Sequence, residues 1–305
     1  MQTKRIIKSF FFRNTSLYVG ATVILLLLIV SAVGRVLRTL PGGDDVCGVT
    51  SLDNVLYVLR SKSSQQIAVY DMDSYCLQRR INVSKLGFMA DMTACAYSHC
   101  LYISGGTDKC VHRVALSDDD VTQWPVNDVA GFLSITNTHT VLVTCRDVRK
   151  IKEFTTHGEL LRQIELSQDV VSPRHAIQLS RGEFIVCHGA RGDPASLHRV
   201  CLLGSDGQVI KSYGGPRGSG SEQMNVPLHM AVDGNGFVFV LDHNNHRVLL
   251  LCSALTYIRE VVSSEQLKWD PLRLFLDDDR RRLYVADNKW DGEKWTAGRV
   301  VVIGV

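Results

Sequence analysis

The 305-residue chain lacks the short sequence patterns by which several enzyme classes are recognised. It contains no His-Glu-x-x-His pattern, no Gly-rich loop ending in Lys-Ser or Lys-Thr, and no readable Ser-His-Asp arrangement. Its most glycine-rich segment, residues 214–220, has neither that lysine nor a following helical pattern, so it is interpreted as a loop between repeats. These absences favour a binding protein over an enzyme.

The first 40 residues contain no acidic residue, and residues 14–34 contain no charge at all. An α-helix of these 21 residues would rise about 30 Å, enough to cross the hydrocarbon core of a bilayer. Four basic residues precede the stretch and two follow it, which favours a cytoplasmic N-terminus. We therefore expect a basic cytoplasmic tail at 1–13, a transmembrane signal-anchor helix at 14–37 and a linker at 38–43. The domain that follows would be lumenal or extracellular.

Two alternatives remain open for the N-terminal segment. A signal peptide cleaved at the small residues of Ala32-Val33-Gly34 would give a secreted protein. A wrongly assigned start codon would instead leave the domain in the cytoplasm. The apolar core exceeds the roughly 7–15 residues typical of a cleaved signal, which favours the anchor.

The rest of the chain lacks an excess of basic residues. Six of the 34 basic residues lie in the first 40 positions, which leaves 28 against all 31 acidic ones in residues 41–305, a net charge of −3. A domain that binds RNA through its phosphates is expected to carry a basic face. The basic clusters at 146–152 and 280–282 are short and lie in turns or beside acids, so nucleic-acid binding is not expected.

The main positive feature of the chain is an internal repeat. A polar or basic residue followed by a β-branched one opens an apolar run six times, at intervals of 47, 37, 49, 48 and 52 residues. The copies are Gln66-Ile67, Arg113-Val114, Lys150-Ile151, Arg199-Val200, Arg247-Val248 and Arg299-Val300. A period of about 40–50 residues is typical of repeat folds, which present binding surfaces more often than they perform chemistry.

Each copy lies in the same succession of short apolar runs. Runs rich in β-branched and aromatic residues precede the copies at 55–58, 101–103, 141–143, 184–186, 238–240 and 283–285. Another apolar stretch lies upstream of each run across a turn of Gly, Asn or Asp, and a fourth run follows each complete copy. Four short strands per repeat is the content of one propeller blade.

The fold class expected is all-β, a six-bladed β-propeller over residues 44–305 that follows a single N-terminal transmembrane helix. The blades are drawn at 44–86, 87–126, 127–166, 167–215, 216–264 and 265–305. Neighbouring blades cover both faces of each sheet, which explains strands that are continuously apolar. The last blade has only three strands before Val305, so residues just before Val46 are expected to supply its outer strand and close the ring.

The fifth repeat resembles an NHL repeat. It has a proline and a small-apolar strand at 226–233, a Gly turn and a second strand ending in Asp at 236–242, and Asn-His-Arg-Val at 245–248. The resemblance weakens toward the N-terminus and implies a propeller similar to the C-terminal domain of tripartite-motif NHL proteins. The Cys/His spacing of RING and B-box domains is lacking, so a ligase activity does not carry over. An intracellular regulator of that type, acting in the ubiquitin pathway or on RNA, remains an alternative.

The charged residues of the last two repeats are expected to be structural. An Asp that ends one strand can pair across the hairpin with an Arg that opens the next. The residues concerned are Asp242, Asn245, Arg247, Asp287 and Arg299.

Three residues at equivalent positions are candidates for a channel-mouth anion or metal site. His175, His229 and Arg273 each lie two residues after a proline, at the start of an innermost strand. They lack a third neutral or anionic metal ligand, although Asp91 is a candidate from the second repeat. The metal is unknown and no cofactor is expected. The competing interpretations are a polar channel rim and a metal-dependent propeller hydrolase or lyase.

The cysteines and a glycosylation sequon bear on the compartment. All nine cysteines follow residue 40, and the pairs Cys95/Cys100 and Cys187/Cys201 are candidates for cross-strand disulfides. Nine reduced, buried cysteines is the alternative. Asn82 begins an Asn-Val-Ser glycosylation sequon, which fits a lumenal domain.

The function expected is a membrane-anchored binding module that docks a protein or peptide on one face, without catalysis. Trp290 and Trp295 lie in an insertion of the last repeat, 289–297, and are candidate anchors for the partner. The oligomeric state is left open by the sequence.

Overall fold

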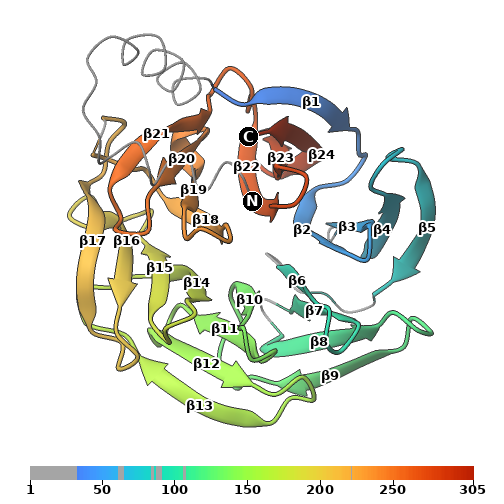
Figure 1. Cartoon of the computed structure of the whole chain (residues 1–305), viewed down its shortest axis with the longest axis horizontal. Coiled ribbons are helices and arrows are strands. Elements are labelled where there is room, and N and C mark those ends of the chain that lie inside the picture. The colour runs from blue at the N-terminus through green and yellow to red at the C-terminus, as the bar shows by residue number, and fades with distance from the viewer. Residues whose placement is uncertain (1–32, 61–64, 84–85, 87–90, 106–107, 221) are drawn as a thin grey trace, which may run out of the picture. The chain divides into compact units, whose positions relative to one another are not determined.

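The computed structural model describes residues 33–60, 65–83, 86, 91–105, 108–220 and 222–305. Residues 34–305 form one compact unit. Six antiparallel sheets of four strands each are arranged in a ring (Figure 1). The prediction of a six-bladed β-propeller is therefore confirmed.

Blade 1 contains β2 (Val46–Leu52), β3 (Val55–Arg60), β4 (Gln66–Asp71) and β5 (Leu77–Asn82). Blade 2 contains β6 (Met92–Cys95), β7 (Cys100–Ser104), β8 (Cys110–Ala115) and β9 (Val121–Pro125). Blade 3 contains β10 (Leu133–Ile135), β11 (Val141–Cys145), β12 (Lys150–Phe154) and β13 (Leu160–Glu165). Each blade lies within its predicted boundaries.

Blade 4 contains β14 (Pro173–Gln178), β15 (Phe184–His188), β16 (Leu197–Leu203) and β17 (Val209–Pro216). Blade 5 contains β18 (Pro227–Val232), β19 (Val238–Asp242), β20 (Arg247–Leu251) and β21 (Tyr257–Val262). Blade 6 contains β22 (Asp270–Asp277), β23 (Arg282–Trp290), β24 (Trp295–Gly304) and β1 (Arg35–Leu40). A single 3₁₀ turn, η1 (His243–Asn245), is the one helical element of the described residues.

The ring closes where the two ends of the propeller meet. Strand β1 pairs antiparallel with β24, with Thr39 opposite Val301 and Leu40 opposite Val300. Blade 6 thus combines three C-terminal strands with one N-terminal strand, as predicted from its missing fourth strand. The pairing hides the β24 edge, which would otherwise expose unpaired backbone groups.

Strand β1 also corrects the predicted membrane segment. The helix was expected to run to residue 37 and a linker to follow at 38–43, whereas Arg35–Leu40 is a strand of blade 6. The pairing with β24 outweighs the apolar pattern there because it satisfies the backbone of both strands. No helix of the described residues is long and apolar enough to span a bilayer, and residues 1–32, which carry most of the predicted helix, lie outside them.

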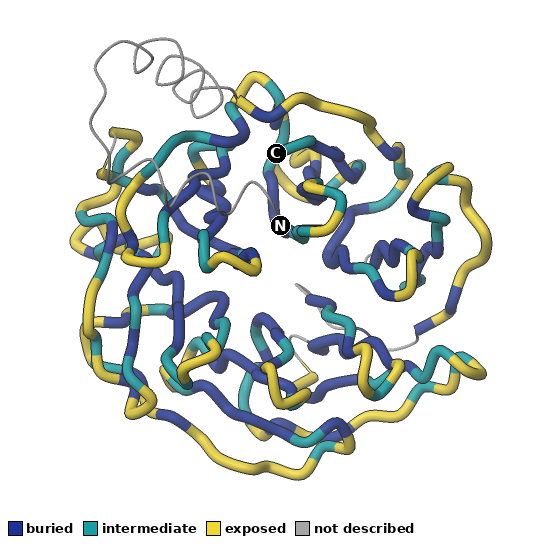
Figure 2. Tube along the Cα trace, viewed as in Figure 1, coloured by how far each residue is buried: buried dark blue, intermediate teal, exposed yellow. Residues whose placement is uncertain are grey.

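The core lies between adjacent blades. One apolar cluster joins Leu59 and Ile67 of blade 1 to Leu101 and Ile103 of blade 2, and another joins blade 5 to blade 6. Inner strands are therefore covered on both faces, while the outer strands β5 and β13 are mostly exposed (Figure 2). This double coverage explains why the central strands read as unbroken apolar runs.

Candidate binding site at the channel mouth

A β-bulge near the start of the innermost strand occurs in blades 1, 4, 5 and 6. A bulge leaves one residue unpaired and re-aims the side chains around it. The bulge residues border a cavity at the mouth of the channel, and they are Cys47, Arg174, Leu228 and Leu272. In blades 4 to 6 the next residue belongs to a second cluster. His175 and His229 lie outside the lining of the cavity, whereas Arg273 of blade 6 belongs to both the lining and the second cluster.

The second cluster, here called the axial cluster, consists of Asp91, His175, His229 and Arg273. Asp91 Oδ1 lies 2.7 Å from Arg273 Nε and 3.6 Å from His229 Nε2. Its other oxygen accepts a hydrogen bond of 2.8 Å from the backbone N–H of Leu133. The three residues predicted from equivalent repeat positions therefore lie together, with a carboxylate among them.

The two histidine rings of the axial cluster stack at 3.9 Å between centroids. His175 Nε2 donates to the carbonyl oxygen of Leu133 at 3.0 Å, and His175 Nδ1 accepts from the N–H of Met230 at 3.2 Å. Both ring nitrogens of His175 are thus engaged by backbone groups, so this ring offers no free lone pair to a metal ion. The cluster joins backbone and side chains of blades 2 to 6.

Protonation in the axial cluster follows from its burial. Burial alone would raise the pKa of Asp91, but Arg273 and His229 outweigh it and hold that pKa well below its usual range. Burial lowers the pKa of His175 and of His229, so both rings are neutral near pH 7. The cluster therefore contains one carboxylate against one guanidinium, a balanced pair.

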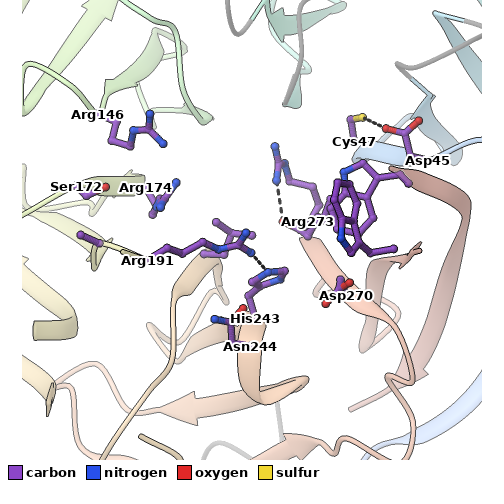
Figure 3. Close-up of a pocket in the computed structure, with 15 residues that line it drawn as sticks. Asp45, Cys47, Arg146, Ser172, Arg174, Arg191, His243, Asn244, Asp270 and Arg273 are labelled. Carbon is purple, nitrogen blue, oxygen red and sulfur yellow. Dashed lines mark hydrogen bonds between the residues drawn. The ribbon is translucent and has the colours of Figure 1, made fainter. Parts of the chain in front are cut away.

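The cavity at the mouth has a volume of about 720 Å³. Its polar lining includes four arginines, Arg146, Arg174, Arg191 and Arg273, with two acidic residues, Asp45 and Asp270. In Figure 3, Arg146, Arg174 and Arg191 project into the cavity from one side, and the two acids lie on the other side with Arg273. Arg146 is paired with Asp147 at 2.9 Å, so the positive charge that remains on the blade 3 and blade 4 side is that of Arg174 and Arg191.

Arg174 is the most unusual member of this lining. It is only 6% exposed, it forms no ion pair, and its Nε has no hydrogen-bond acceptor among the described residues. Burial, reinforced by Arg146 and Arg191, lowers the pKa of the Arg174 guanidinium to about 10. A buried cation that lies beside other cations is costly unless an anion joins it.

Arg191 and His243 also line the cavity, and they contact each other. An N–H of Arg191 donates to Nε2 of His243, while Nδ1 of His243 donates to the carbonyl oxygen of Pro271 at 2.8 Å. Burial and the nearby Arg191 lower the pKa of His243 to about 3, so the ring stays neutral and acts as an acceptor. Arg191 is held in place without its charge being neutralised by this contact.

The predicted partner-binding residues Trp290 and Trp295 also line the cavity. The 289–297 insertion extends the β23–β24 hairpin, and the two rings meet edge to face at 4.9 Å across it. Trp290 is 43% exposed. The hairpin therefore places an aromatic pair on the rim of a cationic cavity.

The predicted structural residues form ion pairs across their hairpins. Arg247 Nε lies 2.9 Å from Asp242 Oδ2, and Asn245 donates to the same carboxylate at 2.7 Å. Arg299 lies 2.6 Å from Asp287. These five residues are engaged with one another within blades 5 and 6.

The remaining candidates lie elsewhere. Asn82 is exposed at the end of β5, where its side chain accepts a hydrogen bond from Gln66. Cys95 lies directly opposite Cys100, as expected for a cross-strand pair, and both are free thiols. Cys187 lies opposite Val200, the residue before Cys201. The side chains of Cys187 and Cys201 therefore point to opposite faces of the sheet, which rules out the predicted Cys187–Cys201 disulfide.

Comparison with known proteins identifies the fold and no more. No family model and no curated protein sequence matches the chain. Virginiamycin B lyase from Staphylococcus aureus is structurally similar, with 10% identity, a TM-score of 0.58 and coverage of 88% of each chain. Hydrazine synthase from Kuenenia stuttgartiensis shares 14% identity at a TM-score of 0.59, over 87% of this chain and 96% of that one.

A third similar structure is the β-propeller domain of Myceliophteria thermophila Cps50 (Swd1), with 10% identity, a TM-score of 0.58 and coverage of 89% of this chain and 99% of that one. The chain is a six-bladed β-propeller. Identities this low carry the fold alone, because proteins that share this propeller fold differ widely in function. An NHL relationship and the activities of the neighbours are not established by them.

Sequence reasoning predicted Arg273 but missed the other three arginines of the mouth. Arg146 was interpreted as part of a solvated basic loop, and Arg174 was passed over in favour of its neighbour His175. A signal was present, because the residue after the repeat proline is Leu228 in blade 5 and Leu272 in blade 6 but arginine in blade 4. A charge at a position that is otherwise apolar would have indicated a special environment.

Proposed function

We propose that this chain is a recognition module that docks an acidic protein or peptide partner at the channel mouth and performs no chemistry there. The observation that supports this most directly is Arg174, a buried guanidinium beside Arg146 and Arg191 that forms no ion pair among the described residues. A carboxylate of the partner, from an acidic side chain or a C-terminus, would supply that anion. Arginine suits this task because its planar fork binds a carboxylate through two parallel hydrogen bonds.

The size and composition of the mouth also support a partner of this kind. A cavity of about 720 Å³ falls within the range of roughly 300–1,000 Å³ for ligand pockets, which fits a few side chains of a peptide. The tryptophan hairpin at the rim would add apolar contact around the charged centre, the arrangement of many protein interfaces. Charge would then set specificity and the aromatic rim would exclude water.

Membrane anchoring is a further part of the proposal. It rests on the uncharged stretch at 14–34 and the basic residues before it. We propose that the propeller is of NHL type, faces the lumen or the cell exterior, and bears a glycan at the exposed Asn82. Protease digestion of sealed microsomes tests the topology: a propeller cleaved without detergent would lie in the cytosol, where the alternative intracellular regulator would act.

The alternative of a metal-dependent hydrolase or lyase has less support. Three of the structural neighbours are lyases in name, but identities of 10% or less transfer no activity. The axial cluster, at which the sequence placed the candidate metal site, engages both nitrogens of His175 with backbone groups. We therefore propose a structural role for that cluster and a binding role for the mouth.

The test uses the full chain in mild detergent and fluorescent peptides that end in acidic residues. Peptides with the acids replaced by amides, peptides with phosphoserine and a single-stranded RNA serve as comparisons. We expect binding to the acidic peptides that weakens with salt and is much weaker in Arg174→Met, but not in Arg181→Gln, an exposed arginine of the β14–β15 turn. Equal binding by Arg174→Met, or binding of RNA alone, would contradict the proposal.

A further inference from the structure

A second group of reactive side chains lies in blade 2, outside the lining of the mouth cavity. It occupies the hairpin between β7 and β8, the position at which blades 5 and 6 carry their Asp–Arg ion pairs. In blade 2 the hairpin instead brings together Asp108, Cys110 and His112. The arginine of the repeat is kept at Arg113, and the carboxylate, the thiol and the imidazole lie just before it in the chain.

The donor atoms of the three residues converge on one point. His112 Nε2 lies 3.1 Å from Asp108 Oδ2 and 3.4 Å from Cys110 Sγ, and all three atoms lie within 4.8 Å of one another. A proton shared by His112 and Asp108 would engage those two atoms only. The thiol beside them is a weak hydrogen-bonding group, whereas a cation at the common centre would engage all three.

The backbone holds this geometry in place. Cys110 and His112 are two residues apart on β8, so their side chains point to the same face of the sheet. Both are buried, while Asp108 keeps the group open to solvent at a small surface pocket. Gln123 lies opposite His112 on β9, and its Oε1 is 3.8 Å from Cys110 Sγ. A fourth possible ligand, the amide oxygen of Gln123, therefore lies beside the three donor atoms.

These separations match those of a tetrahedral zinc site. Zinc binds nitrogen and oxygen at about 2.0–2.1 Å and sulfur at about 2.3 Å, so tetrahedral ligands lie about 3.3 Å (N to O) and about 3.6 Å (N to S) apart. The observed 3.1 and 3.4 Å agree to within a few tenths of an ångström.

We propose that Asp108, Cys110 and His112 form a zinc site, with the amide oxygen of Gln123 or a water molecule as fourth ligand. Zinc would replace the thiol proton of Cys110, which is released to solvent, and would bind Nε2 of neutral His112. The site would tie the β7–β8 hairpin to β9. It is independent of the mouth cavity, because the two share no residue.

The test is metal analysis of the full chain, purified without an affinity tag and then loaded with zinc or cobalt. We expect one zinc per chain and, with cobalt, a thiolate-to-metal absorption band in the near ultraviolet. Asp108→Asn should weaken zinc binding by about 100-fold or more, since loss of a direct ligand should exceed the 10–100-fold cost of an outer-shell change. Cys110→Ser should abolish the cobalt band.

Two control variants distinguish zinc bound at this hairpin from zinc bound elsewhere on the chain. Cys252→Ser removes a partly exposed thiol of blade 5, and Arg174→Met removes the proposed anion site, and both should leave zinc binding unchanged. Asp108 is partly exposed, so Asp108→Asn should fold even if Cys110→Ser does not. Less than one zinc per wild-type chain, or undiminished affinity in Asp108→Asn, would overturn the proposal.

Discussion

The axial cluster and the mouth cavity are neighbouring layers of the same channel, and they treat buried charge in opposite ways. In the axial cluster, the guanidinium of Arg273 lies 2.7 Å from the carboxylate of Asp91, which also bonds a backbone N–H. At the mouth, Arg174 is buried beside Arg191 and Arg146, and it forms no ion pair among the described residues, whereas Arg146 is paired with Asp147. The axial cluster thus pairs its buried guanidinium with a carboxylate, whereas Arg174 at the mouth has no paired anion among the described residues.

The difference separates a structural from a functional use of the same residue types. A buried ion pair such as Asp91–Arg273, whose carboxylate also accepts a backbone N–H, stabilises the arrangement of the blades. In the same cluster, Nδ1 of His229 is buried without a hydrogen-bond partner among the described residues. A buried cation without a partner costs stability, and such a cost is expected where binding depends on it. The predictions below test whether this division is correct.

The largest expected effect is in the axial cluster. Asp91→Asn removes the charge that pairs with Arg273 and leaves that guanidinium buried and uncompensated, so we expect a loss of about 3–5 kcal/mol in the free energy of unfolding. Denaturant unfolding monitored by tryptophan fluorescence would measure it. Asp279→Asn, at an exposed turn position, is the matched control and should change stability little. A cost below about 1 kcal/mol would mean that the cluster is not a structural centre.

Removing the buried charge of Arg174 at the mouth should have the opposite effect on stability from Asp91→Asn. Arg174→Met removes a buried charge that has no partner, so the free energy of unfolding should stay the same or rise. Binding of acidic peptides should weaken by about 10–100-fold, since a hydrogen bond to a charged group contributes about 1.5–3 kcal/mol. Fluorescence anisotropy measures the affinity, and thermal unfolding the stability. If Arg174→Met instead destabilised the fold as strongly as Asp91→Asn, the two layers would not differ in kind.

The ring could be predicted from sequence because its signal is repeated six times. Each blade must bury both faces, so each contributes the same apolar runs and turns, and even the closing strand followed from counting strands in the last blade. The axial cluster was partly predictable for the same reason. His175, His229 and Arg273 occupy equivalent positions, and equivalent positions of a ring meet at its axis.

The mouth could not be predicted in this way because it depends on differences between blades. Arg146 and Arg191 lie in loops after β11 and β15, whose paths the repeat does not determine. Arg174 reaches the cavity only because a bulge turns it away from the axis, and bulges leave no clear mark in the sequence. The cysteines also show what the sequence could not predict. Whether Cys187 and Cys201 face each other depends on strand register, because a shift of one residue moves a side chain to the other face of the sheet.

Acid should affect the buried histidine of the mouth. The pKa of His243 is about 3 in the folded state and 6.5 for a free histidine, so between these values the unfolded chain binds one more proton than the folded one. The free energy of unfolding therefore falls as pH drops through this window, by about 1.4 kcal/mol per pH unit for this residue. His243→Gln should reduce that slope between about pH 6 and pH 4.

The matched control for the acid effect is His157→Gln, at an exposed turn position. Denaturant unfolding at several pH values gives the slope for each protein. An unchanged slope in His243→Gln would mean that the His243 ring can be protonated in the folded protein, and that its contact with Arg191 adapts to the charge.

The smallest expected effect is at the tryptophan rim, and it tests how far the binding surface extends beyond the arginines. Trp290→Ala and Trp295→Ala should each weaken peptide binding by about 1 kcal/mol, or several-fold, because a rim aromatic contributes less than a buried charge contact. The melting temperature should fall by no more than a few degrees for Trp290→Ala, since that ring is 43% exposed. Trp124→Ala, in the core of blades 2 and 3, is the contrasting control and should destabilise strongly without a specific effect on affinity. A large loss of stability in Trp290→Ala would place the hairpin in the fold's own core and confine the recognition surface to the charged cavity.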